Sequence, residues 1–157
     1  MARSQGDDVR RAIDAELQPG EVFRVVFPVL IPPPNVGGGW GEAAVIVPLF
    51  WAVRKSMWRR AAASVQAQVG IPLRRRMLWG TTDRRVLIFA AGARWKVGPL
   101  IASIDRSDVI RAVAPSTVSE GWRSVAFELA NRPDLCVKVP ARLVDPIVNG
   151  FGGQAHR

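Results

Sequence analysis

The sequence predicts a mainly β (α+β) fold. We expect a curved antiparallel sheet or small barrel, with a short helix before it, a helix inserted into it and a C-terminal helix capping it. Two observations predict this architecture. Apolar and polar residues alternate along several short segments separated by turn residues in the second half of the chain. Apolar residues at helical spacing occur near both ends and in one segment before most of the strands. The 157 residues fit a single domain, 1–157.

One helix and one strand are expected before residue 32. Asp7 or Asp8 can cap a helix over 9–17, whose apolar residues fall on one face. Segment 22–31 is rich in β-branched residues and predicts the first strand. Pro28 lies inside this strand and favours an edge position or a bend, because proline has no N–H to donate to a neighbouring strand.

Residues 32–76 are predicted to be an insertion made of a loop and an amphipathic helix. A glycine-rich loop leads to 43–53, which are all apolar, and basic residues follow directly. Apolar side chains at helical spacing predict a helix over about 51–68, closed by Gly70 and Pro72. The apolar stripe of this helix consists of Trp51, Trp58, Ala62, Val65 and Val69.

Strand periodicity follows the helix. Segments bounded by turn residues predict strands at 73–80, 85–90, 94–97, 100–104 and 109–113. Gly98-Pro99 and the turn at 105–108 are expected to interrupt this series.

The last part of the chain predicts a hairpin and a helix. Segments 124–129 and 135–139 both alternate cleanly between apolar and other residues. The intervening 131–134 are turn residues, so the two strands are expected to pair in an antiparallel hairpin. A short helix after Pro140 has an apolar face made of Leu143, Val144, Ile147 and Phe151.

Three motifs resemble a known family. Leu17-Gln18-Pro19-Gly20-Glu21 precedes the first strand, Thr82-Asp83-Arg84-Arg85 opens a middle strand, and 104–113 combine apolar and acidic residues. Together they resemble the bacterial pleckstrin-homology-like (PH-like) domain family over about 17–30 and 78–151. The resemblance implies seven strands in two near-orthogonal sheets, a capping C-terminal helix and no catalytic residues. The insertion departs from the family pattern, and such insertions in related proteins are often hydrophobic helices, sometimes membrane-associated.

The net charge of +9 is concentrated in one segment. Residues 54–96 hold eleven basic residues and one acidic residue, Asp83, whereas the rest of the chain holds eleven basic and twelve acidic residues. This asymmetry favours an anionic partner, namely an anionic phospholipid surface, nucleic acid or an acidic protein. The alternative is an arginine-rich surface without a dedicated partner. The basic residues are Arg54, Lys55, Arg59, Arg60, Arg74, Arg75, Arg76, Arg84, Arg85, Arg94 and Lys96.

The residue types argue against the common catalytic chemistries, so we expect a protein that is not an enzyme and needs no cofactor or metal. The single histidine, His156, is one residue from the end, so a serine or cysteine nucleophile lacks a stably placed histidine base. His156 and Cys136 are too few ligands for a zinc site. The three-glycine run of the insertion is not followed by the lysine of a phosphate-binding loop. Asp83, Asp105 and Asp108 are expected to have structural roles at turns.

The preferred function is a binding module that associates peripherally with anionic membrane surfaces. Trp51 and Trp58 belong to a residue type that favours membrane interfaces, and basic residues border their stripe. Each basic residue near an anionic surface contributes on the order of 1 kcal/mol. Alternatively, the stripe packs on the chain's own sheet. The residues predicted to bind the membrane or another anion are Trp51, Arg54, Lys55, Trp58, Arg59, Arg60, Arg74, Arg75 and Arg76.

Two other functions stay open. Nucleic acid would combine phosphate contacts with base stacking on Trp58, Trp79 and Trp95. Against it, no helix-turn-helix, zinc-finger or RNP motif is present, and tryptophan in a strand is more often buried. A protein-interaction or homo-oligomerisation module would use sheet edges, the inserted helix or the apolar run at 43–53.

A cytoplasmic location is expected, with peripheral attachment at the inner face of the cell membrane. The first residues are polar and charged and lack the apolar stretch of a secretory signal. The single cysteine gives no internal disulfide. The apolar run at 43–53 is too short to cross a bilayer, which takes about 20 residues.

Overall fold

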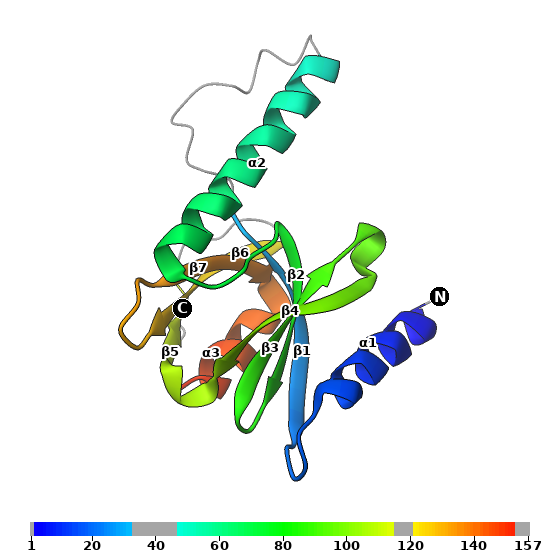
Figure 1. The fold of residues 1–157 in the computed structure, drawn as a ribbon, viewed down its shortest axis with the longest axis vertical. Helices are drawn as coiled ribbons and strands as arrows, with labels where there is room; N and C mark the ends of the chain where they lie inside the picture. Colours follow the sequence, from blue (N-terminus) through cyan, green and yellow to red (C-terminus); the bar gives the residue numbers. More distant parts are fainter. Residues whose placement is uncertain (1, 33–46, 115–120, 153–157) are drawn as a thin grey trace.

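In the part of the chain that the structure describes, seven strands form one central antiparallel sheet (Figure 1). The computed structural model describes residues 2–32, 47–114 and 121–152. The strand order is β4-β3-β2-β1-β7-β6-β5, with β4 and β5 as its edges, and the sheet is not closed. The mainly β prediction is therefore confirmed. The strands are β1 (Phe23–Leu30), β2 (Arg76–Thr82), β3 (Arg85–Ala91), β4 (Val97–Asp105), β5 (Val109–Val113), β6 (Trp122–Leu129) and β7 (Leu135–Pro140).

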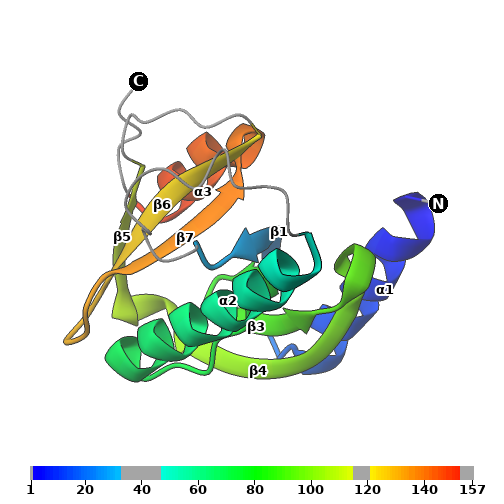
Figure 2. The same ribbon diagram turned by 90° about the horizontal axis from the view of Figure 1, so that it is seen from above.

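Among the described residues three helices accompany the sheet, and two of them lie where the sequence predicts them. The three helices are α1 (Ala2–Glu16), α2 (Val47–Val69) and α3 (Val144–Gly150), with single 3-10 turns η1 (Ala93–Trp95), η2 (Arg106–Asp108) and η3 (Ala141–Leu143). The first helix begins at Ala2, seven residues before the predicted 9–17, so Asp7 and Asp8 lie inside it and the capping role expected of them is wrong. Figure 2 shows β5, β6 and β7 turned at an angle to β3 and β4, with α3 beside β6 and α1 beside β4.

The main core lies between the inner face of the sheet and α3. The β6–β7 hairpin alternates as predicted: Phe127 pairs with Leu135 across the two strands, and both side chains are buried. Asn131 has a φ of 57° in the turn between them, a conformation that asparagine tolerates better than most residues. The predicted apolar face of the C-terminal helix is confirmed, because Ile147 and Phe151 are buried against this core.

A second, smaller core lies on the outer face of β2 and β3. There Val9 and Ile13 of α1 pack against Leu78, Leu87 and Phe89. Gly80 allows this close approach, since a Cβ atom at that position would lie 3.1 Å from the Cδ1 atom of Ile13. Because both faces of β2 are covered, all its residues after Arg76 are buried.

Two details of the predicted strands are wrong. Segment 94–97 is not a strand of its own, because Arg94 and Trp95 belong to η1 and Val97 begins β4. Strand β4 continues through Gly98-Pro99, where only its pairing with β3 shifts register. A Cβ atom at position 98 would lie 2.8 Å from the carbonyl oxygen of Ala90, so only glycine fits there. Proline is tolerated at the next position because β4 is an edge strand.

Pro28 lies in an internal strand, although the sequence favoured an edge or a bend. β1 has neighbours on both sides, but Pro28 pairs with Leu78 of β2 only. The single register pair between β1 and β7 is Leu30 with Lys138. Pro28 therefore has no paired residue on the β7 side of β1. Its missing N–H group costs no hydrogen bond between these two strands.

The inserted helix α2 is longer than predicted and docks at its C-terminal end. It begins at Val47, and Pro48 is tolerated because it lies in the first helical turn. Ala62 and Val69 are buried, and Val65 packs on the main core. These last positions of the stripe therefore pack on the protein itself. In Figure 1, α2 ends beside the sheet and begins well away from it.

Several sequence predictions fall outside the described residues. They concern the glycine-rich loop, residues 43–46 of the apolar run and His156. Helix α2 contains Trp51, Arg54, Lys55 and Trp58, but their side chains also lie outside the described part of the structure.

Candidate anion-binding surface

Antiparallel pairing gathers basic residues at one end of the sheet. Leu30, at the end of β1, pairs with Arg76 at the start of β2 and with Lys138 near the end of β7. Ala91, at the end of β3, pairs with Val97 at the start of β4. The connections and strand ends at this position carry the residues of the basic end: Arg74, Arg75, Arg76, Arg94, Lys96, Arg123 and Lys138.

The opposite end of the sheet carries acidic as well as basic residues. Asp83 lies in the β2–β3 turn, and Asp105, at the end of β4, pairs with Arg85 at the start of β3. Arg84 and Arg85 belong to this end as well, although they belong to the basic segment 54–96 of the sequence. That segment is therefore not one surface, whereas Arg123 and Lys138, which lie outside it in sequence, join the basic end.

A groove runs between α2 and the segment before β2. Its volume is about 470 Å³, and it is lined by Arg59, Ala62, Ala63, Gln66, Leu73, Arg74 and Arg75. We call it the α2 groove. None of these lining residues is acidic. The structure thus brings together Arg59, Arg74 and Arg75, which the sequence proposed as anion-binding residues on separate elements.

The other proposed residues lie elsewhere. Arg60 is exposed on α2 but does not line the α2 groove. Arg76 is also exposed, and its guanidinium carbon lies 5.9 Å from the ring centre of Trp95. Arg60 and Arg76 therefore add positive charge around the groove without lining it.

The connection between β3 and β4 has an unfavourable backbone conformation at Arg94 and Trp95. Arg94 and Trp95 have φ values of 52° and 61°, and the Lys96 amide donates to the carbonyl of Ala93 at 3.1 Å. Two consecutive residues with positive φ are typical of a type I′ turn, which favours Asn-Gly. Here the Trp95 ring stacks on Trp122 at 5.6 Å. An arginine and a tryptophan therefore occupy two positions at which glycine would be unstrained.

Replacing Arg94 with glycine should raise the free energy of unfolding by about 0.5–1 kcal/mol, because glycine adopts positive φ without strain. Lys96→Gly is the matched control, since Lys96 has a φ of −61° in the same turn. That variant should lower the free energy of unfolding by about 0.5–1 kcal/mol. Urea denaturation followed by circular dichroism measures both. Equal losses in the two variants would mean that the contacts of Arg94 outweigh its backbone strain.

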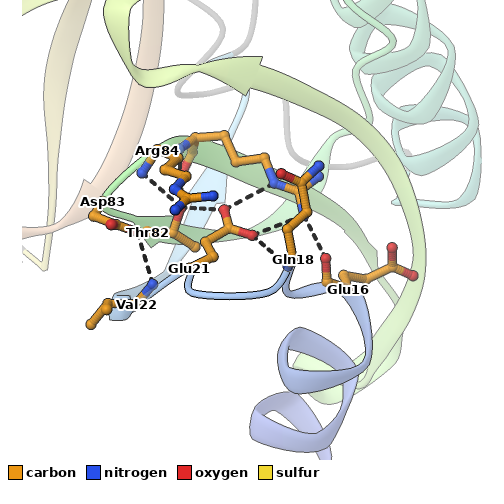
Figure 3. A network of polar contacts seen from close by, with 8 residues as sticks. Glu16, Gln18, Glu21, Val22, Thr82, Asp83 and Arg84 are labelled. Carbon is orange, nitrogen blue, oxygen red and sulfur yellow. Dashed lines mark hydrogen bonds and ion pairs between the residues drawn. The ribbon is translucent and has the colours of Figure 1, made fainter.

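The two main motifs of the family resemblance meet at the opposite end of the sheet (Figure 3). Glu21 of the first motif is buried, and its Oε1 accepts from the Thr82 hydroxyl at 2.6 Å and from Arg85 Nε at 2.9 Å. Its Oε2 accepts from Arg85 Nη2 at 3.0 Å and from the Gln18 amide at 2.8 Å. The hydrogen bonds from Arg85 are the largest cause that lowers the pKa of Glu21 to about 2.

Asp83 completes this connection between the α1–β1 junction and the β2–β3 turn. Its Oδ1 accepts from the Val22 amide at 2.8 Å, and its own amide donates to the Val22 carbonyl at 3.0 Å. The turn role predicted for Asp83 is confirmed. Arg85 also donates to the Glu16 carbonyl at the end of α1. We call Glu21, Thr82, Asp83 and Arg85 the polar lock, and its function is structural.

A second groove, of about 540 Å³, separates the start of β1 from α3. Arg106 lines it, donates to the Gly150 carbonyl at 2.7 Å and lies over the Phe151 ring at 4.2 Å. Burial lowers the pKa of Arg106. Asp83 also lines this groove. The mixed charge and the existing contacts of Arg106 make this groove a weaker anion site than the α2 groove.

Other chemistry is sparse in the part of the chain that the structure describes. There, no three His, Cys, Asp or Glu residues lie close enough together to hold a metal ion. Desolvation of the sulfur and the nearby Asp134 raise the pKa of the Cys136 thiol, which disfavours the reactive thiolate. The structural role expected of Asp105 would be to cap the turn at 105–108, and this expectation is wrong, because its side chain makes no capping hydrogen bond to η2.

Neither the length of the described helices nor comparison with known proteins indicates a function. Within residues 2–32, 47–114 and 121–152, no helix is both long enough and apolar enough to cross a bilayer. Among known proteins, no family model, no curated sequence and no solved structure matches this chain.

Proposed function

We propose that this chain is a non-enzymatic PH-like module that binds anionic membrane surfaces peripherally through its basic end and α2. The observation that carries the proposal is the spatial convergence of Arg59, Arg74 and Arg75 on one groove beside the other cations of the basic end. Because each cation near an anionic surface contributes on the order of 1 kcal/mol, several of them together support reversible attachment. The inner face of the cell membrane is the proposed location.

The PH-like assignment rests on strand order and on the motifs. Strands β1 to β4 follow one another in the sheet, β5 to β7 do the same, and a helix follows β7. The resemblance implies two sheets, whereas the seven described strands belong to one sheet that divides into these two groups at the single register pair between β1 and β7. The helix after β7 corresponds to the C-terminal helix that the resemblance implies. The contact between Glu21 and Arg85 further supports it, since the two residues come from the two motifs that carry the resemblance.

Nucleic acid is the less favoured partner. Trp79 is 1% exposed, and the Trp95 ring already contacts Trp122. Trp79 is therefore closed to a nucleotide base, and the contact with Trp122 already occupies part of the half-buried Trp95 ring, which leaves little of the stacking that single-stranded nucleic acid needs. An acidic protein is the alternative partner for the same basic end, whereas a second copy of the chain would use a sheet edge, the inserted helix or the apolar run at 43–53.

Flotation of the purified protein with vesicles tests the proposal. Wild type should float with anionic vesicles at low salt, and flotation should fall at high salt and with neutral vesicles. The double variant Arg74→Glu/Arg76→Glu should bind about tenfold more weakly or worse. Arg24→Glu/Arg84→Glu changes the charge equally at the opposite end and should retain binding. Equal losses in both variants, or no flotation of wild type, would contradict the proposed membrane surface.

A further inference from the structure

We infer that the α2 groove is a discrete site for a phosphate monoester group. This inference deepens the proposed function. It rests on that function where the phosphate group belongs to a membrane lipid. The groove is lined by three arginines, Arg59, Arg74 and Arg75, and by no acidic residue among the described residues. Guanidinium groups are donors only, and their planar forks match the oxygens of a phosphate. A ligand for this lining must therefore supply several acceptor oxygens and negative charge.

Gln66 adds a fourth donor to the groove. Its Oε1 accepts from the Leu73 amide at 3.2 Å, which identifies the oxygen side of the side-chain amide. The remaining NH₂ group can only donate. Gln66 also links α2 to the segment that carries Arg74, so the two walls of the groove are connected directly.

The walls are held in place before any ligand binds. On one side, Ala62 and Val69 of α2 are buried, at 7% and 3% exposure. On the other side, Leu73 is 5% exposed, and the Arg75 carbonyl accepts from the Ile31 amide at 3.1 Å. The separation between Arg59 and Arg74 is thus set by packed elements, which reduces the ordering cost of binding.

A phosphate monoester fits this lining better than a phosphodiester or a carboxylate. It presents three terminal oxygens and close to two negative charges near neutral pH, whereas a phosphodiester presents two terminal oxygens and one charge. The volume of about 470 Å³ leaves room for the group to which the phosphate is attached. The phosphate can belong to a lipid headgroup or to a soluble molecule, since the shared chemistry is the monoester.

Vesicles matched for surface charge separate a discrete site from general attraction. Phosphatidic acid carries a phosphate monoester, whereas phosphatidylserine carries a phosphodiester and a carboxylate. Wild type should prefer phosphatidic acid vesicles by about tenfold, as expected for one additional charge-assisted contact. Arg59→Gln should abolish this preference. Its neighbour Arg60→Gln is the matched control and should keep it, because Arg60 does not line the groove.

Inorganic phosphate and methyl phosphate, titrated into the protein alone, provide an independent readout. The NMR signals of the Gln66 side-chain NH₂ and of Arg59 Nε–H should shift in a saturable way, and equal ionic strength from chloride should shift neither. These shifts in a protein that fails to float would support a soluble phosphorylated ligand and contradict membrane binding. Equal flotation on both anionic lipids without any phosphate-dependent shift would overturn the phosphate site and leave the membrane proposal intact.

Discussion

Replacing Glu21 with glutamine should lower the free energy of unfolding by about 3–5 kcal/mol, the effect expected when one partner of a buried ion pair is removed. The Glu21 side chain is 0% exposed and that of Arg85 is 15% exposed. Each carboxylate oxygen of Glu21 accepts two hydrogen bonds. A glutamine NH₂ group placed on either side would therefore face two donors, and Arg85 would lose its counter-charge. Urea denaturation at neutral pH measures the loss.

The same variant should have a characteristic pH dependence. Glu21 has its pKa lowered from 4.5 to about 2 in the folded protein, so its ionised form stabilises the fold. This contribution, about 3 kcal/mol, is present above pH 4.5 and is lost as the pH falls toward 2. The difference between wild type and Glu21→Gln should narrow across this window. A difference that stays constant there would contradict a stabilising role for the charge.

Two control variants distinguish the effect of the buried Glu21–Arg85 ion pair from the effect of removing any carboxylate. Glu128→Gln removes a carboxylate that contacts Arg111 at 2.7 Å, but the Arg111 side chain is 55% exposed, so the change should be small. The double variant Glu21→Leu/Arg85→Met removes both charges of the buried pair. It should be more stable than either single variant, because neither charge is then left buried without its partner.

The sequence predicted those elements whose signal is local. The β6–β7 hairpin alternates within each strand and has turn residues between them, so neighbouring residues contain the whole signal. The turn at Arg94 and Trp95 was missed because its sequence lacks the Asn-Gly signature of its conformation. It is stabilised by the contact with Trp122, which lies on a different strand, and no local pattern reports such a contact.

The candidate site was predicted only in part, for a similar reason. Arg59, Arg74 and Arg75 were recognisable as members of a basic segment. Arg84 and Arg85 lie at the other end of the sheet because they follow the β2–β3 turn. Arg85 is also paired with the buried Glu21 and is therefore not a free surface charge. Gln66 could not be identified from sequence, because its role depends on the docking of α2 beside Leu73. Charge composition therefore predicted the chemistry of the site and not its boundaries.

Trp79→Ala should lower the free energy of unfolding by about 3–5 kcal/mol, because it leaves a large cavity where the two parts of the sheet meet. Trp79 lies on β2 and contacts Phe27 of β1 and Phe127 of β6, at ring-centre distances of 6.1 and 5.1 Å. Since β1 and β7 share only one register pair, side-chain packing must hold β1–β4 against β5–β7. Trp79 is therefore central to the packing that positions the basic end.

Trp79→Phe should lose less than half as much stability as Trp79→Ala. Phenylalanine keeps an aromatic ring in the core and removes the indole N–H, whose nitrogen is buried without a hydrogen-bond partner among the described residues. Removing a buried unsatisfied donor recovers about 1–3 kcal/mol, which offsets part of the lost packing. Trp122→Ala is the control, and its half-buried, stacked ring should contribute less than Trp79. Similar losses for Trp79→Phe and Trp79→Ala in thermal unfolding would show that the indole nitrogen has a partner and that the two parts of the sheet depend on it.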